Sequence, residues 1–129
     1  MRRLDFSKHK DFFDLGNAEN IDTYRLNRIY AIMSTLPKKQ FILIGDSTQR
    51  DAEIFAQAFK FNKSKVKCIF IRKVSGVDEE KEETLNKKRR FEKIFEDVPE
   101  DSWYVFEDFE DLEKIKFSSA TCRPVEKRN

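Results

Sequence analysis

Two aspartates that follow an apolar run are the residues of this sequence best suited to chemistry. Asp46 ends the segment FILIGD, and Asp51 comes five residues later. In open α/β sheets, ligands bind at the carboxyl ends of the strands. Mg²⁺ takes hard oxygen ligands, commonly one or two carboxylates, while water and a substrate phosphate complete its octahedron. The pair therefore predicts a divalent metal site beside a phosphate, with Asp46 and Asp51 as metal ligands.

The residues around this pair favour an anion at the same place. Ser47 and Thr48 offer hydroxyl and backbone N–H groups near the start of a predicted helix, where anions bind readily. Gly45 lets another group approach the backbone closely. A second interpretation is that Asp46 or Ser47 caps the helix and that Asp51 is an ordinary acid of its first turn. From these residues alone, both interpretations stay open.

The elements that must position the pair form a strand–helix–strand unit. The run Gln40–Gly45 is apolar without alternation, which predicts a strand buried on both faces, with parallel neighbours and helices on either side. Helical spacing of apolar residues follows from about 50 to 61. Val66–Arg72 (VKCIFIR) predicts a second buried strand, so the three elements form a βαβ unit.

The rest of the chain supplies flanking elements. We expect a helix over 22–36, one long charged helix over 78–97, a third strand over 103–107 and a short helix over 108–115. The predicted fold class is α/β, with a parallel sheet of about three strands flanked by helices. Residues 1–116 form the predicted domain and 117–129 a flexible tail.

Composition excludes several function classes. The 129 residues carry a net charge of +2 and 39% hydrophobic residues, which is globular and too weakly basic to indicate nucleic-acid binding. No apolar run reaches the roughly 18–20 residues of a transmembrane helix, and the N-terminus lacks the apolar core of a secretion signal. We therefore expect a cytoplasmic protein in a reducing compartment, with peripheral attachment to membranes left open. Cys68 and Cys122 are predicted to be unpaired, Cys68 as a small core residue.

Several segments together resemble a known family of enzymes. The similarity covers roughly residues 20–110, and its specific part extends from the GDS motif to Arg72. These segments resemble the C-terminal half of the catalytic domain of actin-patch-associated phosphatidate phosphatases, members of the haloacid dehalogenase superfamily. The segments are Tyr24–Ile29 (YRLNRI), Leu36-Pro37, Phe41–Ser47 (FILIGDS), Asp51–Phe55 (DAEIF), Ile69–Arg72 (IFIR) and Phe106–Asp108 (FED).

The resemblance implies a Mg²⁺-dependent phosphatase on a partial Rossmann-like fold of the dehalogenase type. In that family an aspartate of a DxDxT motif attacks phosphorus and forms an aspartyl-phosphate. By analogy Asp46 and Asp51 hold the metal, and Arg25 stands where the family has the lysine that neutralises the phosphate. The implied substrate is a phosphorylated lipid or another phosphomonoester. No DxDxT occurs in this sequence, so the chain alone is expected to be inactive.

Two hypotheses follow from the missing motif. In the first, the chain is the C-terminal portion of such an enzyme, and its missing N-terminal half completes the site. In the second, it is a degenerate module that binds a phosphorylated ligand, a protein partner or a second copy through an open sheet edge. Both hypotheses expect a free edge beside Phe41–Gly45, because no strand in the sequence is available to fill it.

Overall fold

The computed structural model describes residues 18–115 and 121–124. The chain divides into two units, residues 1–39 and 40–129, and each is considered by itself. The described part of the first unit contains one helix, α2 (Ala18–Thr35), where the sequence predicted 22–36. Hydroxyl groups of Ser34 and Thr35 donate to the carbonyls of Ala31 and Ile32 in its last turn. Pro37 then prevents the helix from continuing.

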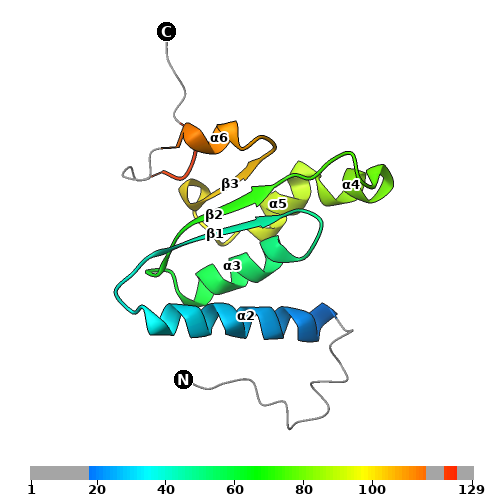
Figure 1. The fold of residues 1–129 in the computed structure, drawn as a ribbon. Coiled ribbons are helices and arrows are strands. Elements are labelled where there is room, and N and C mark those ends of the chain that lie inside the picture. The colour runs from blue at the N-terminus through cyan, green and yellow to red at the C-terminus, as the bar shows by residue number, and fades with distance from the viewer. Residues whose placement is uncertain (1–17, 116–120, 125–129) are drawn as a thin grey trace. The chain divides into compact units, whose positions relative to one another are not determined.

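The second unit is a three-stranded sheet with helices (Figure 1). All strands are parallel and their order is β1-β2-β3, which confirms the predicted α/β class. Its elements along the chain are β1 (Phe41–Asp46), α3 (Asp51–Phe61), β2 (Val66–Arg72), α4 (Glu79–Leu85), α5 (Lys88–Ile94), the 3-10 turn η2 (Glu100–Ser102), β3 (Trp103–Phe106) and α6 (Glu110–Glu113).

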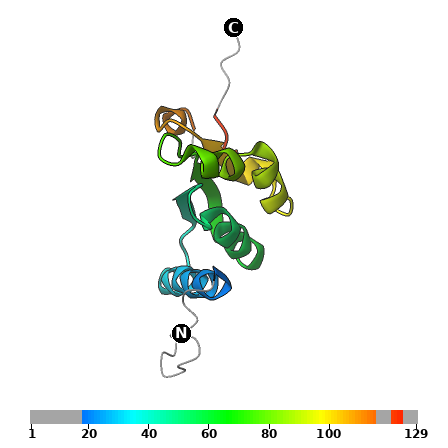
Figure 2. The ribbon, with the colours of Figure 1, turned by 90° about the vertical axis from the view of Figure 1, so that its right-hand side faces the viewer.

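Strand β2 lies at the centre of the core. Its residues Ile69, Phe70 and Ile71 are fully buried, because β-branched and aromatic side chains on both faces meet packed neighbours. Helix α3 contributes buried Ile54, Phe55, Ala58 and Phe59. Seen from the side, α3 and α5 lie on one side of the strands and α6 on the other (Figure 2).

The prediction that β1 is buried on both faces was wrong. Ile42 and Ile44 are 40% and 56% exposed. They pair with Cys68 and Phe70 of β2 and so point to the same face of the sheet. On that face the described cluster that buries Cys68 and Phe70 is built from β3, α6 and the segment around Cys122, and it does not extend over β1.

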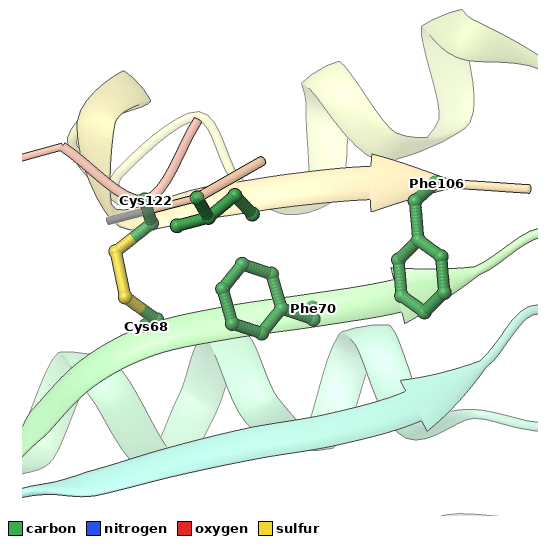
Figure 3. Packing of buried hydrophobic residues seen from close by; sticks show 5 residues of the cluster. Cys68, Phe70, Phe106 and Cys122 are labelled. Carbon is green, nitrogen blue, oxygen red and sulfur yellow. A yellow bond between two sulfur atoms is a disulfide. The ribbon is translucent and has the colours of Figure 1, made fainter. Parts of the chain in front are cut away.

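The two cysteines form a disulfide, so the prediction of unpaired thiols was also wrong. The sulfur atoms of Cys68 and Cys122 are bonded, and the pair lies in the same apolar cluster as Phe70 and Phe106 (Figure 3). A separation of 54 residues gives no local signal. The pairing arises because the chain returns past the start of β3 after α6, and this brings the two Cα atoms to 5.8 Å.

Residues 121–124, predicted to belong to a flexible tail, are tied to the sheet by this bond and by polar contacts. The Cys122 N–H donates to the Asp101 carbonyl at 2.7 Å, and Thr121 Oγ1 donates to Asp101 Oδ1 at 3.0 Å. Arg123 Nε donates to the Glu100 carbonyl at 2.8 Å, and its guanidinium lies 4.9 Å from the Trp103 ring centre. The remaining tail positions lie outside the described residues.

The single helix predicted over 78–97 is two helices. Asn86 ends α4, and its side-chain amide donates to the Val74 carbonyl at 2.8 Å. Lys87 is extended, and α5 starts after it. In α5, Arg90 reaches Glu53 of α3 through two contacts of 3.0 and 3.2 Å. The break thus places α5 where an ion pair holds it against α3, with Arg90 Nη2 in contact with both carboxylate oxygens of Glu53.

No helix in residues 18–115 and 121–124 has the length and apolar content needed to cross a bilayer.

Loss of the disulfide should destabilise the second unit. Cys122→Ser removes a cross-link that closes a loop of 54 residues, so the unfolded chain gains entropy. We expect the free energy of unfolding to fall by about 2–4 kcal/mol, measured by urea denaturation. Dithiothreitol should lower the stability of the wild type by a similar amount and leave Cys122→Ser unchanged. A wild-type curve insensitive to the reductant would contradict the pairing.

Candidate metal and phosphate site

The carboxyl end of β1 brings the two predicted metal ligands together. The Ser47 N–H donates to the Arg72 carbonyl of β2, and residues of a parallel strand alternate in the side to which their backbone groups point. The N–H of Asp46 therefore points away from β2. Asp51 Oδ2 accepts it at 2.9 Å. The predicted proximity of Asp46 and Asp51 is thus present in the structure.

Gly45 makes this contact possible. A Cβ built on Gly45 would lie 2.5 Å from Asp51 Oδ2 and 2.6 Å from Asp51 Cβ, far inside contact distance. Asp51 is 7% exposed, and a buried carboxylate needs hydrogen bonds to offset its lost hydration. A glycine at position 45 is therefore required by the close approach of the Asp51 side chain.

The carboxylate of Asp46 is oriented by the turn that follows. Its Oδ1 accepts from Thr48 N at 2.9 Å and from the Thr48 hydroxyl. No hydrogen bond or ion pair to its Oδ2 occurs in the described part of the chain. A half-buried Asp46 with one fixed and one free oxygen is a suitable monodentate ligand for a hard cation.

Ser47 connects the carboxyl ends of β1 and β2 through hydrogen bonds. It is 1% exposed, and its Oγ accepts from Val74 N at 3.0 Å. Together with the Ser47 N–H bond to the Arg72 carbonyl, this contact fixes the exit of β1 to the exit of β2. Thr48 is exposed, and its hydroxyl is bonded to Asp46. The assignment of Ser47 and Thr48 to anion binding stays a prediction.

Asp46 and Asp51 fit a magnesium ion that takes most of its ligands from water and phosphate. Within the described ranges, no group of three or more His, Cys, Asp or Glu side chains is placed to hold a metal. Asp46 and Asp51 would therefore be the two carboxylates that the protein contributes to the metal. Mg²⁺ commonly binds through one or two carboxylates, because water and phosphate oxygens supply its other ligands.

Arg25 belongs to helix α2 of the first unit and is partly buried there. The site at the sheet is formed by the second unit, so the predicted contact of Arg25 with a phosphate stays a prediction.

Sequence reasoning missed a second buried acid, in helix α4, whose carboxylate reaches the loop after β2. Glu82 is 7% exposed, and its carboxylate accepts three backbone N–H groups, from Gly76, Val77 and Asp78, at 2.7–3.0 Å. Gly76 has φ of +86°, a left-handed conformation that turns its N–H into this cradle. The hydrogen bond from Asp78 lowers the pKa of Glu82 most, and those from Val77 and Gly76 add to it. The sequence signal for this buried acid is limited to Gly76, which precedes a run of acidic residues.

Gly45→Ala should disturb the contact between Asp51 and Asp46. The added methyl group forces the Asp51 side chain and the start of α3 to move, because α3 is packed on the sheet. We expect a loss of about 1–3 kcal/mol in the free energy of unfolding, measured by denaturant titration. Gln57→Ala, on the exposed side of α3, is the matched control and should change little. Equal stability of Gly45→Ala and the wild type would refute the close approach.

The Glu82 carboxylate should make stability depend on pH. Its pKa is lower in the folded state than its ordinary value of 4.5. Its contribution is therefore complete above that value and is lost as the pH falls through the lowered pKa. Glu82→Gln should flatten this acid limb in thermal melts recorded from neutral pH down to pH 3. Exposed Glu83→Gln should retain the wild-type profile, and an unchanged profile for Glu82→Gln would rule out the ionised cradle.

Part of the chain is similar to a known protein family. Searches of curated proteins and of solved structures found no match. A family model described as "Phosphatidate phosphatase APP1, catalytic domain" matches residues 1–73. This match spans more than half of the 129 residues and includes β1, the Asp46–Asp51 turn, α3 and β2. The chain therefore belongs to the family of the phosphatidate phosphatase APP1 catalytic domain.

Proposed function

We propose that this chain carries the metal-binding half of a Mg²⁺-dependent phosphatidate phosphatase of the haloacid dehalogenase type. The observation that carries the proposal is the hydrogen-bonded pair of Asp46 and Asp51 at the end of a parallel strand in a chain of this family. When bound, the metal would neutralise phosphate charge and orient the phosphoryl group for attack.

The residues of the chain have distinct parts in this proposal. Asp46 offers its free Oδ2 to the cation, while Thr48 holds the other oxygen. Asp51 fixes the backbone at Asp46 and would complete or orient the metal shell. Arg25 would take the place of the family lysine, although its planar guanidinium presents a fork where lysine presents a compact ammonium.

The nucleophile would have to come from another segment, since the 129 residues contain no DxDxT motif. Strand β1 pairs only with β2 among the described residues, and none of these residues adds a strand at its second edge. Backbone groups of Ile42 and Ile44 point to that edge, and both side chains are well exposed. A parallel strand added there would end beside Asp46. Substrate, metal and an attacking carboxylate would then meet at one edge of the sheet.

A second candidate function rests on the same open edge. An isolated sheet edge pairs readily with other chains, so the domain would act as a non-catalytic binding module for a protein partner, a second copy or a phosphorylated ligand. Sequencing the genomic DNA upstream of Met1 separates the two. An in-frame segment encoding DxDxT supports the enzyme, and a nearby stop codon supports the module.

Metal binding can be tested without turnover. Mn²⁺ added to the isotopically labelled protein should broaden the backbone amide signals of Thr48 and Gln49, which adjoin Asp46. Asp46→Asn should weaken this effect by about tenfold or more, because it removes a ligand charge. Asp97→Asn, at an exposed acid that lies outside the site, is the control. If Mn²⁺ broadens the amide signals beside all surface acids equally, the chain has no specific metal site at Asp46 and the proposal fails.

Phosphatase activity forms the second test. The chain alone should release no phosphate above background from phosphatidate or from an aryl phosphate in the presence of Mg²⁺, since it has no aspartyl nucleophile. Co-expression with a segment that carries DxDxT should produce activity that Asp46→Asn abolishes. Mg²⁺-dependent turnover by the chain alone, lost in Asp46→Asn, would overturn the view that the nucleophile lies elsewhere.

A further inference from the structure

Strand β3 has a free edge that lines a cavity. Lys73 N donates to the Phe106 carbonyl, so Phe106 and, two residues before it, Tyr104 turn their backbone groups toward β2. Trp103 and Val105 therefore turn theirs the other way. No hydrogen bond to these outward groups occurs within residues 18–115 and 121–124. Unpaired backbone groups of a sheet edge are ready partners for another strand.

The cavity beside this edge has a volume of about 300 Å³. Trp103, Tyr104 and Val105 all line it, which is the pattern of a strand seen along its edge because successive side chains point to opposite faces. Helix α5 supplies one further wall through Phe91, and Arg123 of the disulfide-bonded segment contributes to another. We call this cavity the β3 slot.

The charges of the β3 slot are polarised along the strand. At the carboxyl end of β3, Lys73 lies beside Phe106, and Lys88 follows the α4–α5 junction that Asn86 fixes to the Val74 carbonyl. At the amino end, Glu100 lies in η2, the turn that directly precedes β3. Glu92 follows Lys88 by one turn on α5. It lies at the amino end of β3, because it lines a neighbouring hollow together with Glu100 and Trp103, and Lys88 does not line that hollow. Lys73 is paired with Glu107 at 3.3 Å, so Lys88 gives the carboxyl end its excess positive charge, and at the amino end Glu92 and Glu100 outnumber Arg123.

We propose that the β3 slot binds an extended peptide segment of a protein partner as a fourth strand. The peptide would place an acidic side chain near Lys73 and Lys88 and a basic side chain near Glu92 and Glu100. Alternating outward N–H and C=O groups at Trp103 and Val105 match a peptide backbone, which has both donors and acceptors. A small anion would meet outward carbonyls and two carboxylates as well, and so fits the slot less well.

The sequence contains a single tryptophan, so Trp103 reports directly on the slot. The probes are two six-residue peptides with blocked termini, Glu-Thr-Val-Thr-Val-Lys and the charge-reversed Lys-Thr-Val-Thr-Val-Glu. Added to the full chain with its disulfide intact, one of the two should change Trp103 fluorescence saturably and more strongly than the other. Equal effects of both peptides, or no effect of either, would overturn the proposal.

Variants at the slot sharpen the test. The double variant Lys88→Glu/Glu92→Lys reverses two exposed charges and should weaken the preferred peptide about threefold to tenfold while improving the other. Lys93→Glu, on the same helix but outside the slot, is the matched control and should leave the preference unchanged. If the double variant leaves the preference between the two peptides unchanged, the charges of the slot do not select the peptide, and the proposal is refuted.

The backbone contribution is tested separately. Val105→Pro removes an outward N–H and also replaces a side chain that lines the slot. Proline is accepted on edge strands whose N–H faces solvent. The variant should abolish peptide binding while far-ultraviolet circular dichroism stays native. Binding retained in the folded Val105→Pro protein, or a Trp103 response reproduced by inorganic phosphate, would exclude strand addition. If this variant does not fold, the charge-reversal pair still decides the question.

Discussion

The contact on which the site depends is the hydrogen bond from Asp46 N to Asp51 Oδ2. It joins the last residue of β1 to the first of α3, and so fixes where the helix begins relative to the strand. The buried carboxylate is tolerated because it accepts an N–H that would otherwise be unpaired. The bond forms only because residue 45 has no side chain. One missing methyl group therefore determines whether the Asp51 carboxylate reaches the backbone at the exit of this strand.

A related device organises the exit of the next strand. Glu82 is also nearly buried and accepts three backbone N–H groups of the loop that follows β2. The Ser47 hydroxyl links the two exits through the Val74 N–H. Both turns at the carboxyl edge are thus shaped by protein hydrogen bonds, independently of any ligand. Preformed turns of this kind lower the entropy lost on binding, which suits a site with few protein ligands.

Local sequence patterns predicted most of the fold and the proximity of the two aspartates. The bounds of β2 were predicted correctly, since apolar β-branched residues between polar turns give a clear signal. Proximity of Asp46 and Asp51 follows from a strand that leads directly into a helix. The exposure of Ile42 and Ile44 could not be predicted, because an apolar run does not say which layers cover it. The Cys68–Cys122 bond and the helix break at Asn86 depend on contacts between distant segments.

The sheet has two free edges of different character among the described residues. The edge of β1 runs beside exposed Ile42 and Ile44 and ends at Asp46, so a strand added there would bury apolar surface and reach the proposed metal ligands. The edge of β3 lies in a walled cavity with opposite charges at its ends. Burial favours stable pairing at the first edge, whereas exposed charges give selectivity with little affinity at the second. The two proposals therefore differ in kind: strand pairing at β1 would be lasting, and peptide binding at β3 would be transient.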